Sequence, residues 1–343
     1  MGRLMTSHAL LSINRQHIVD NFINLDHLSK RETAAVVKAN AYGTGAQQII
    51  PALVDVGVED FFVAQPSEYA QVASLLPQNG RVYVLNGASL LDGDMLADKK
   101  MVPVVNNHRD LLALSSHQGP VAYHLDTAMK RLGFLSKDWH MIPKNPHMVM
   151  SHLSCADEDD LVTQKQILQF QEVVENMAPE RASLANSEGI IHHPTSHYDL
   201  TRPGIGLYGG VAFDGVKPVM TLSAKILQKN NLNKDDHVGY GATFTAEGPL
   251  AAYVLGIGYA DGLPRHLSNQ SYKTSQGLEL SFLGRISMDS CVVGVHNATF
   301  EEGQWIDLIY SPEDLAILAK VAGTISYELL TGLGSQFRGQ RCL

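Results

Sequence analysis

A lysine stands directly after an apolar, β-branched segment in the stretch TAAVVKANAYGTG, residues 33–45. The apolar flank dehydrates the Lys38 amine and lowers its pKa, which makes it a candidate for Schiff-base chemistry. Gly43 and Gly45 follow, and the backbone N–H groups of such a turn can hold a phosphate where a helix begins. The same residues also suit a lysine that reaches from a strand end to solvent before an ordinary turn. The segment by itself leaves both interpretations open.

Other reactive side chains form weaker patterns. The histidine-rich stretch HHPTSH, residues 192–197, lacks the i, i+4 pair of a helical zinc motif. Cys155, Cys291 and Cys342 lie far apart and include no C-x-x-C, so neither a disulfide framework nor a structural zinc site is expected. We therefore expect no metal, and the cysteine usage favours a reducing compartment.

The elements that must position Lys38 alternate between short apolar runs and amphipathic stretches. Between the runs, apolar residues recur at helical spacing, for example in 46–58, 67–76 and 158–177. The candidate strands end near residues 37, 64, 85, 105, 126, 152, 185 and 202. This repeat matches a (β/α)₈ barrel, whose active site lies at the strand ends. A doubly wound open sheet would give a similar alternation.

The pattern changes after about residue 215. Only 312–333 looks helical again. Strand-like runs separated by Gly, Asp, Asn and Pro turns occupy 220–228, 237–246, 250–260, 278–287, 290–298 and 304–311. The sequence therefore predicts an α/β protein with a barrel domain over residues 1–215 and an all-β domain over residues 216–343.

Composition limits the function classes. The 343 residues are 45% hydrophobic and 18% charged, which excludes a disordered chain or a fibrous rod. The net charge of −9 provides no overall field for nucleic acid. The longest uncharged apolar run, 248–260, is too short to cross a bilayer, and the first residues lack the apolar stretch of a signal peptide. We expect a cytoplasmic enzyme that binds neither nucleic acid nor membrane.

Motifs along nearly the whole chain resemble those of alanine racemases. The stretch around Lys38 is similar to their pyridoxal-phosphate attachment motif. Further matches follow in family order: HLDTAMKRLG (124–133), SHLSCADE (151–158), LANSEG (184–189), RPGIGLYGG (202–210), GYGATFTA (239–246), GYADGLPR (258–265), GRISMD (284–289) and GTISYELLTGLG (323–334). The resemblance implies a (β/α)₈ barrel followed by a β domain, with pyridoxal 5′-phosphate as cofactor.

The resemblance also implies two catalytic residues. Lys38 would hold the cofactor covalently and exchange the α-proton on the D-face of the amino acid. Tyr259 would serve the L-face from the partner subunit of a homodimer. Inverting a stereocentre by proton transfer needs an acid/base on each side of the planar carbon. Outside this motif, a tyrosine in a β-rich stretch is usually an amphipathic packing residue.

The remaining roles follow from the same resemblance. Arg202 would face the pyridine nitrogen of the cofactor and keep it unprotonated, because arginine stays charged. His152 would hydrogen-bond Arg202, and Arg131 would approach the cofactor's phenolic oxygen and the substrate carboxylate. Met288 and Asp289 would line substrate entry near Tyr259. The remaining cofactor-binding residues would be Leu85 and, around the phosphate, Tyr42, Ser187, Gly204, Ile205 and Tyr208.

Three positions depart from the family pattern. Many members have a lysine that becomes carbamylated where this chain has His124, so Arg131 must be positioned otherwise. Ala128 replaces a usual glycine, which implies either an ordinary backbone there or some strain. The C-terminal stretch GSQFRGQRCL has Ser335 nearest to a tyrosine that reaches the phosphate in other members, and we expect that contact to be lost.

The sequence thus predicts a homodimeric alanine racemase that supplies D-alanine for peptidoglycan. A serine or broad-specificity racemase is the nearest alternative, since sequence does not resolve the pocket. A non-catalytic pyridoxal-phosphate-binding homeostasis protein is disfavoured by the C-terminal domain and Tyr259. A decarboxylase fits poorly, because Arg202 makes the cofactor a weaker electron sink.

Overall fold

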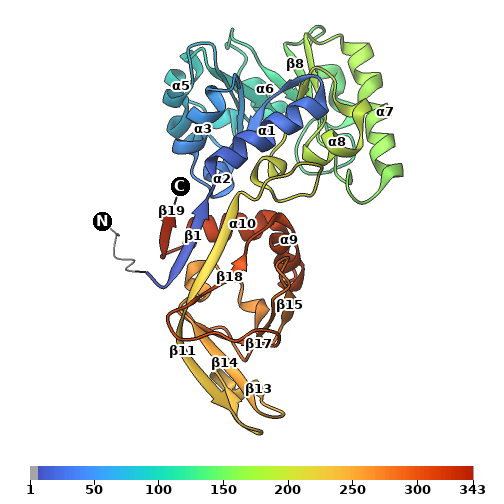
Figure 1. Cartoon of the computed structure of the whole chain (residues 1–343). Helices are drawn as coiled ribbons and strands as arrows, with labels where there is room; N and C mark the ends of the chain where they lie inside the picture. Colours follow the sequence, from blue (N-terminus) through green and yellow to red (C-terminus); the bar gives the residue numbers. More distant parts are fainter. Residues whose placement is uncertain (1–6, 343) are drawn as a thin grey trace. The chain divides into compact units, whose positions relative to one another are not determined.

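The computed structural model describes residues 7–342, which form two compact units (Figure 1). The barrel unit contains residues 19–41 and 45–207. The β unit contains the described residues up to Ile18, residues 42–44, and the chain from Tyr208 onward. The division at residue 215 stays a prediction, and the sequence does not indicate that the N-terminal strand belongs to the β unit.

The barrel unit is built on parallel strands, as predicted. Seven of them form one sheet in chain order, β3-β4-β5-β6-β7-β8-β9. An eighth, β10, pairs in parallel with β2. The bounds are β2 (Glu32–Thr33), β3 (Ala35–Val36), β4 (Asp60–Val63), β5 (Arg81–Val84), β6 (Met101–Val105), β7 (Ala122–His124), β8 (Met148–Met150), β9 (Arg181–Ser183) and β10 (Leu200–Thr201).

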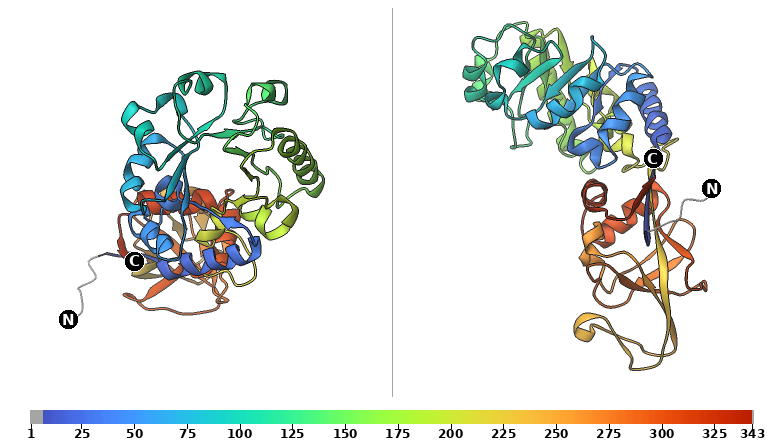
Figure 2. Two further views of the ribbon diagram at one scale, coloured as in Figure 1. Left: turned by 90° about the horizontal axis from the view of Figure 1, so that it is seen from above. Right: turned by 90° about the vertical axis from the view of Figure 1, so that its left-hand side faces the viewer.

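Backbone hydrogen bonds on both sides of β10 close these strands into a barrel. On one side the Ala34 N–H donates to the Thr201 carbonyl at 2.9 Å. On the other side the Arg202 N–H donates to the Ala185 carbonyl at 3.0 Å. The view from above in Figure 2 shows the strands of this unit curving round, with helices outside them. The eight strand ends predicted from the sequence are therefore confirmed.

Helices follow most strands of the barrel. The longest, α7, begins after Asp159, whose carboxylate accepts hydrogen bonds from the Leu161 and Val162 N–H groups. Its buried face includes Ile167 and Phe170, at the helical spacing that the sequence predicts. The helices are α1 (Arg15–Ser29), α2 (Lys38–Tyr42), α3 (Ala46–Val54), α4 (Pro66–Val72), α5 (Gly93–Ala97), α6 (His108–Ala113), α7 (Asp160–Met177) and α8 (Ser187–His192).

Short 3₁₀ turns complete the barrel unit. They are η1 (Ala73–Leu75), η2 (Ala88–Leu90), η3 (Ser136–Met141), η4 (Pro194–Ser196) and η5 (Ile205–Tyr208), the last of which ends at the first residue of the β unit.

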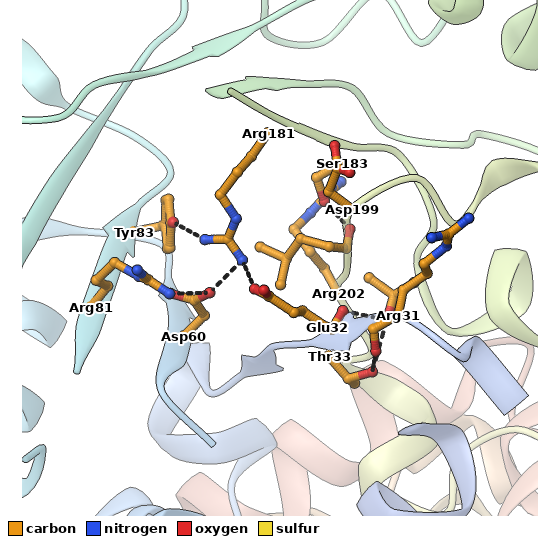
Figure 3. A network of polar contacts seen from close by, with 12 residues as sticks. Arg31, Glu32, Thr33, Asp60, Arg81, Tyr83, Arg181, Ser183, Asp199 and Arg202 are labelled. Carbon is orange, nitrogen blue, oxygen red and sulfur yellow. Dashed lines mark hydrogen bonds and ion pairs between the residues drawn. The ribbon is translucent and has the colours of Figure 1, made fainter. Parts of the chain in front are cut away.

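The N-terminal end of the barrel carries a network of paired charges (Figure 3). Asp60, which begins β4, is 3% exposed and accepts hydrogen bonds from the Arg81 Nη2 at 3.0 Å and the Arg181 Nη2 at 2.9 Å. Arg181 also contacts Glu32 and donates to the Tyr83 hydroxyl at 3.1 Å. Two arginines and two carboxylates therefore neutralise one another at this end.

The β unit contains a mainly antiparallel sheet of eight strands, in the order β15-β16-β17-β14-β11-β1-β19, with β18 also paired to β11. A separate pair is formed by β12 and β13. The strands are β1 (Ala9–Ile13), β11 (Met220–Leu232), β12 (His237–Val238), β13 (Phe244–Thr245), β14 (Leu250–Leu255), β15 (Ser271–Lys273), β16 (Glu279–Phe282), β17 (Cys291–Val295), β18 (Trp305–Ile309) and β19 (Gln340–Cys342).

Three predicted segments differ in detail. The strand predicted over 250–260 ends at Leu255, because residues 259–261 turn back as the 3₁₀ segment η7 (Tyr259–Asp261). The run 237–246 is two short strands around η6 (Tyr240–Ala242). The helix predicted over 312–333 is two helices, α9 (Pro312–Val321) and α10 (Ser326–Gln336), separated at Gly323, whose φ is 70°.

A last 3₁₀ turn, η8 (Arg265–Leu267), follows η7. Within residues 7–342, no single helix has the length and hydropathy of a membrane span. Only α9 and α10 taken together meet those two criteria, and they are bent by 97° where they join.

Candidate active site

The chain turns sharply where β3 ends, and Lys38 begins the turn. Residues 39–41 all have φ between 52° and 54°, which is the left-handed helical conformation. Each such residue costs about 1–2 kcal/mol relative to a right-handed one. The Gly45 N–H closes the turn by donating to the Asn40 carbonyl at 3.0 Å. Strain of this kind persists where the surroundings fix it, and it is characteristic of functional sites.

Glu68 supports this turn, and the sequence analysis did not identify it. Its carboxylate accepts a hydrogen bond from the Ala39 N–H at 2.7 Å and another from the Ala64 N–H at 2.6 Å. It therefore joins the residue after Lys38 to the end of the neighbouring strand β4. The capping box that Glu68 forms with Gln65 at the start of α4 is a signal that could have drawn attention to it.

Burial lowers the pKa of the Lys38 amine, and the positive charge of Arg131 lowers it further, against an opposing effect of Glu68. The sequence-based expectation of a dehydrated amine is therefore confirmed. A lowered pKa increases the fraction of neutral amine, which is the nucleophilic form and the proton-accepting form.

Arg202 is a buried cation at the same end of the barrel. Its guanidinium donates to the Ser183 hydroxyl and to the carbonyls of Ser151 and Leu184. The ring of Phe62 lies below it, with 5.7 Å between the guanidinium carbon and the ring centroid. Burial lowers the pKa of Arg202 to about 9, so the group stays protonated at neutral pH.

His152 does not hydrogen-bond Arg202 within the described residues, contrary to our expectation. The guanidinium instead donates to hydroxyl and carbonyl oxygens. The pKa of His152 lies well below its usual value, first because the ring is buried and next because of the charges of Arg202 and Arg131. His152 is therefore a neutral ring among cations.

His124 is held by a residue that sequence reasoning also missed. Its Nδ1 lies 2.8 Å from the Asn106 Oδ1, and the Asn106 amide donates to the carbonyls of Leu85 and Val104. These bonds assign the amide oxygen to the side facing His124, so Nδ1 carries the proton. Burial, then Arg202 and Arg131, lowers the pKa of His124 to about 3. Asn106 directly follows β6, and that position at a strand end was the available signal.

The Ser187 hydroxyl organises the loop after β10. It accepts hydrogen bonds from the Gly204 and Gly206 N–H groups, both at 3.0 Å. In the part of the chain described, Ser187 acts only as an acceptor, so its own proton can be donated to a ligand. The Gly204 N–H is engaged by Ser187, while Ile205 is buried at the start of η5.

The C-terminal end of the barrel therefore carries cations that no carboxylate is paired with. Among residues 7–342, neither Lys38 nor Arg131 nor Arg202 forms an ion pair. The nearby carboxylate of Glu68 accepts backbone N–H groups instead, while that of Asp126 accepts backbone N–H groups and pairs with Lys130 at 3.7 Å. Such a site attracts an anionic ligand.

The remaining predicted residues lie in the β unit. Tyr42 and Tyr208 are both buried, and their rings stack at 4.6 Å between centroids. Burial raises the pKa of both phenols above the usual range, so both remain neutral donors. Tyr259, at the start of η7, is 38% exposed, and Met288 is also exposed. The Ala260 N–H donates to the Met288 carbonyl at 3.1 Å, which brings these two segments together.

The family departures have visible consequences. Ala128 has a φ of 138°, so the glycine-to-alanine difference is accompanied by a conformation that alanine rarely adopts. Ser335 donates to the Gly332 carbonyl at 3.3 Å within α10. In the histidine-rich stretch, ring nitrogens of His193 and His197 lie within hydrogen-bond distance of backbone carbonyls. The described residues contain no group of three metal-ligating side chains placed to share an ion.

Two family models match the chain in succession. The model described as alanine racemase, N-terminal domain, covers residues 13–212, and the model described as alanine racemase, C-terminal domain, covers residues 219–341.

Individual relatives match over nearly full length. An alanine racemase of Rhodospirillum rubrum is 36% identical, over 98% of this chain and 96% of the relative. A protein of Agrobacterium fabrum named alanine racemase, catabolic, is 34% identical, over 96% of this chain and 90% of its own. The crystal structure of alanine racemase from Bartonella henselae with covalently bound pyridoxal phosphate has a TM-score of 0.87 at 31% identity, covering 98% of this chain and 99% of that one.

Proposed function

This chain belongs to the alanine racemase family, and we propose from that premise that it interconverts L-alanine and D-alanine with pyridoxal 5′-phosphate as cofactor. One observation supports the proposal above the others. The C-terminal end of the barrel gathers an amine of lowered pKa and two arginines with no carboxylate paired to them. That combination suits a carbonyl cofactor with a phosphate, together with a substrate carboxylate.

The residues present fit this cofactor by their chemistry. Lys38 supplies the amine for covalent attachment, and Ser187 has a proton to donate to a phosphate oxygen. Arg202 supplies a fixed cation for the pyridine nitrogen. We further assign Leu85 and Ile205 to the cofactor's surroundings, and Tyr42 and Tyr208 to the phosphate. The Gly204 N–H donates to the Ser187 hydroxyl, so we assign it to orienting that hydroxyl rather than to the phosphate itself. When bound, pyridoxal phosphate withdraws electrons from the α-carbon and so acidifies its proton.

Two side chains move the α-proton in this proposal. The neutral Lys38 amine takes it from, or returns it to, the D-face. Tyr259 does the same on the L-face, taking the proton as the phenolate and returning it as the phenol. Burial and the charge of Arg131 lower the pKa of Lys38, which increases the fraction of neutral amine that can act as the base. The carbon must then receive its new proton from the opposite side, which is the step that inverts the stereocentre.

Substrate orientation is assigned to the remaining candidates. Arg131 provides a cation for the substrate carboxylate, and the Met288 backbone N–H is a second donor in that proposal. Asp289 lines the entry to the site beside Tyr259. His152 stays neutral, so it adds no further positive charge to the site beside Arg202.

We further infer a cytoplasmic homodimer in which Tyr259 completes the partner's site. The three cysteines are free of disulfides, which agrees with a reducing compartment. Supply of D-alanine for peptidoglycan is the proposed role. Because the Agrobacterium fabrum relative is named catabolic, breakdown of alanine is the alternative for the pathway.

Hydrogen–deuterium exchange at the α-carbon tests the chemistry. The purified protein should show the visible absorbance of covalently bound cofactor, and Lys38→Ala should abolish it. In deuterated water, Tyr259→Phe should suppress exchange of L-alanine by about 10²-fold or more, while exchange of D-alanine persists. A protein that binds the cofactor but exchanges neither enantiomer would instead support the homeostasis alternative.

Mixing two inactive variants tests the shared site. A heterodimer of Lys38→Ala and Tyr259→Phe subunits has one site with both defects and one with neither. After random re-association, about one quarter of the parent activity should return. No recovery, with heterodimers verified by mass, would contradict a site built from two subunits.

A panel of L-amino acids followed by chiral separation distinguishes alanine from serine or broader specificity.

A further inference from the structure

Arg338, in the C-terminal stretch that departs from the family pattern, contacts two carboxylates in the β unit. Its Nε donates to the Asp261 Oδ1 at 3.0 Å, and its Nη2 lies 3.3 Å from the Asp261 Oδ2. The same Nη2 donates to the Asp289 Oδ1 at 2.7 Å. One guanidinium therefore joins three segments that are far apart in the sequence.

Asp261 is part of the turn that carries Tyr259. Its Oδ2 accepts the Gly258 N–H at 3.0 Å, so Tyr259 lies inside a loop closed by this carboxylate. The Asp261 side chain is 8% exposed, and a buried carboxylate requires a partner for its charge. Within the described residues, Arg338 is the only cation paired with it.

The Tyr259 turn also packs closely on the segment before Asp289. The Tyr259 N–H donates to the Ser287 carbonyl at 3.1 Å. A Cβ on Gly258 would lie 2.3 Å from the Met288 carbonyl oxygen, so only glycine permits this approach. Arg338 binds a carboxylate on each side of this contact, and its fork holds the two segments together.

The backbone on both sides of Arg338 is anchored. Phe337 is buried, and β19 pairs in parallel with β1. A Cβ on Gly339 would lie 2.6 Å from the Ala9 carbonyl oxygen, which shows how closely the chain passes β1. The guanidinium is thus presented from a short segment whose two neighbours, Phe337 and Gly339, are both held in place.

We propose that Arg338 is a positioning residue that acts through Asp261 to hold Tyr259 in place for proton transfer. The inference rests on the proposed role of Tyr259 on the L-face. The bidentate contact with the buried Asp261 provides the main effect, while the contact with Asp289 is solvent-exposed and contributes less. The divergent C-terminal stretch thereby acquires a role in this chain's chemistry.

The test compares exchange on the two faces in the holoenzyme. Arg338→Met removes the fork, and Arg338→Lys keeps the charge but cannot bind Asp261 through two nitrogens while reaching Asp289. We expect Arg338→Met to slow α-proton exchange of L-alanine by about tenfold to a hundredfold, with Arg338→Lys intermediate. Exchange of D-alanine with retained configuration should change less than about twofold in both variants.

Arg341→Met is the matched control. Arg341 lies in the following strand β19 and contacts the Gly334 carbonyl rather than the Tyr259 turn. We expect the ratio of L-face to D-face exchange to stay at the parent value in this variant. Asp261→Asn should lower L-face exchange as Arg338→Met does, and the double variant should be no worse than the poorer single one.

Three outcomes would overturn the proposal. Equal loss on both faces at retained cofactor absorbance would indicate a general structural role. Unchanged L-face exchange in Arg338→Met would show that Tyr259 needs no such support. Additive losses in the double variant would show that Arg338 does not act through Asp261. If Arg338→Met fails to fold, the ratio of L-face to D-face exchange is measured in Arg338→Lys instead, and an unchanged ratio there overturns the proposal. Failure of the proposed function gives a different result, because Tyr259→Phe would then slow α-proton exchange equally for L-alanine and D-alanine, or not at all.

Discussion

The two ends of the barrel treat buried charge in opposite ways. At the N-terminal end, Asp60 is bound by Arg81 and Arg181, and the second of these also contacts Glu32 (Figure 3). At the C-terminal end, Lys38 and Arg202 have no carboxylate partner among residues 7–342. Both ends are built from the same strands. The N-terminal end is formed by residues that begin the strands, and the C-terminal end by residues that follow them.

The difference separates stabilisation from binding. Paired charges at the strand beginnings satisfy one another, and such an end has no electrostatic need for a ligand. At the strand ends, burial and then the charge of Arg131 lower the pKa of Lys38, and burial lowers the pKa of Arg202, so keeping these groups charged is a cost to the folded state. An anionic ligand would remove that cost. The same unpaired cations therefore both destabilise the ligand-free protein and provide its affinity for an anionic ligand.

A column of side chains connects the two ends through the barrel interior. The Arg202 guanidinium lies over the ring of Phe62, and Phe62 stacks on Tyr83 at 4.4 Å between centroids. The Tyr83 hydroxyl then accepts a hydrogen bond from Arg181. The aromatic rings separate the cationic end from the neutralised end, and they provide the face on which Arg202 rests.

Breaking the neutralised end should have the largest effect on stability. Asp60→Asn leaves Arg81 and Arg181 with one carboxylate between them, and loss of a buried ion pair costs about 3 kcal/mol. We expect the urea midpoint to fall, while racemisation per folded molecule changes little. A loss of activity larger than the loss of folded protein would show that the two ends are not independent.

Removing a cation from the other end should affect chemistry instead. Arg202→Gln is expected to reduce racemisation by about 10²-fold, the usual effect of deleting one oriented charge at a reacting centre. It should also raise the pKa of His152, because the charge of Arg202 is one cause of its lowered value. Titration of the ring by NMR checks this, and Asp60→Asn is the control that should leave His152 unchanged.

The pH dependence of stability should report the cationic end. The pKa of His124 falls from the ordinary 6.5 to about 3 in the folded protein, so between these values the unfolded chain binds more protons. Stability is therefore fully present above pH 6.5 and is lost as the pH falls toward 3. From pH 7 to pH 5 this histidine should account for about 2 kcal/mol of the free energy of unfolding. His124→Asn should flatten the profile, and an unchanged slope would contradict the assignment.

Sequence alone predicted the strand ends of the barrel, because the apolar runs and the helical spacing between them are local signals. It also predicted the dehydrated amine of Lys38, since a lysine directly after an apolar run is visible in one segment. Asn106, which directly follows β6, and Glu68, in the first turn of α4, were missed. Their roles depend on partners about 20 to 30 residues away, which periodicity does not reveal.

Packing explains the other gaps. In the sequence, Phe62 cannot be distinguished from the other apolar residues of a buried strand. Only the structure shows that its ring lies beneath the Arg202 guanidinium. The strand β1 was assigned to the barrel domain by position, but its hydrogen bonds with β11 place it in the β unit. Arg338 stood in a stretch known only for its divergence, and its two carboxylate partners lie 77 and 49 residues away.

The smallest expected effect concerns Lys38 itself and sharpens the comparison most directly. Burial is the main cause of its lowered pKa, and Arg131 is the second. Arg131→Gln should therefore raise the pKa of Lys38 without restoring the ordinary value, and the amine should become reactive at a higher pH. The rate of amine modification in cofactor-free protein, followed against pH, measures this shift. Arg81→Gln changes a cation at the neutralised end and should leave the profile where it was. If both variants shifted it equally, the charge of the whole barrel rather than the local excess of cations would set the reactivity of Lys38.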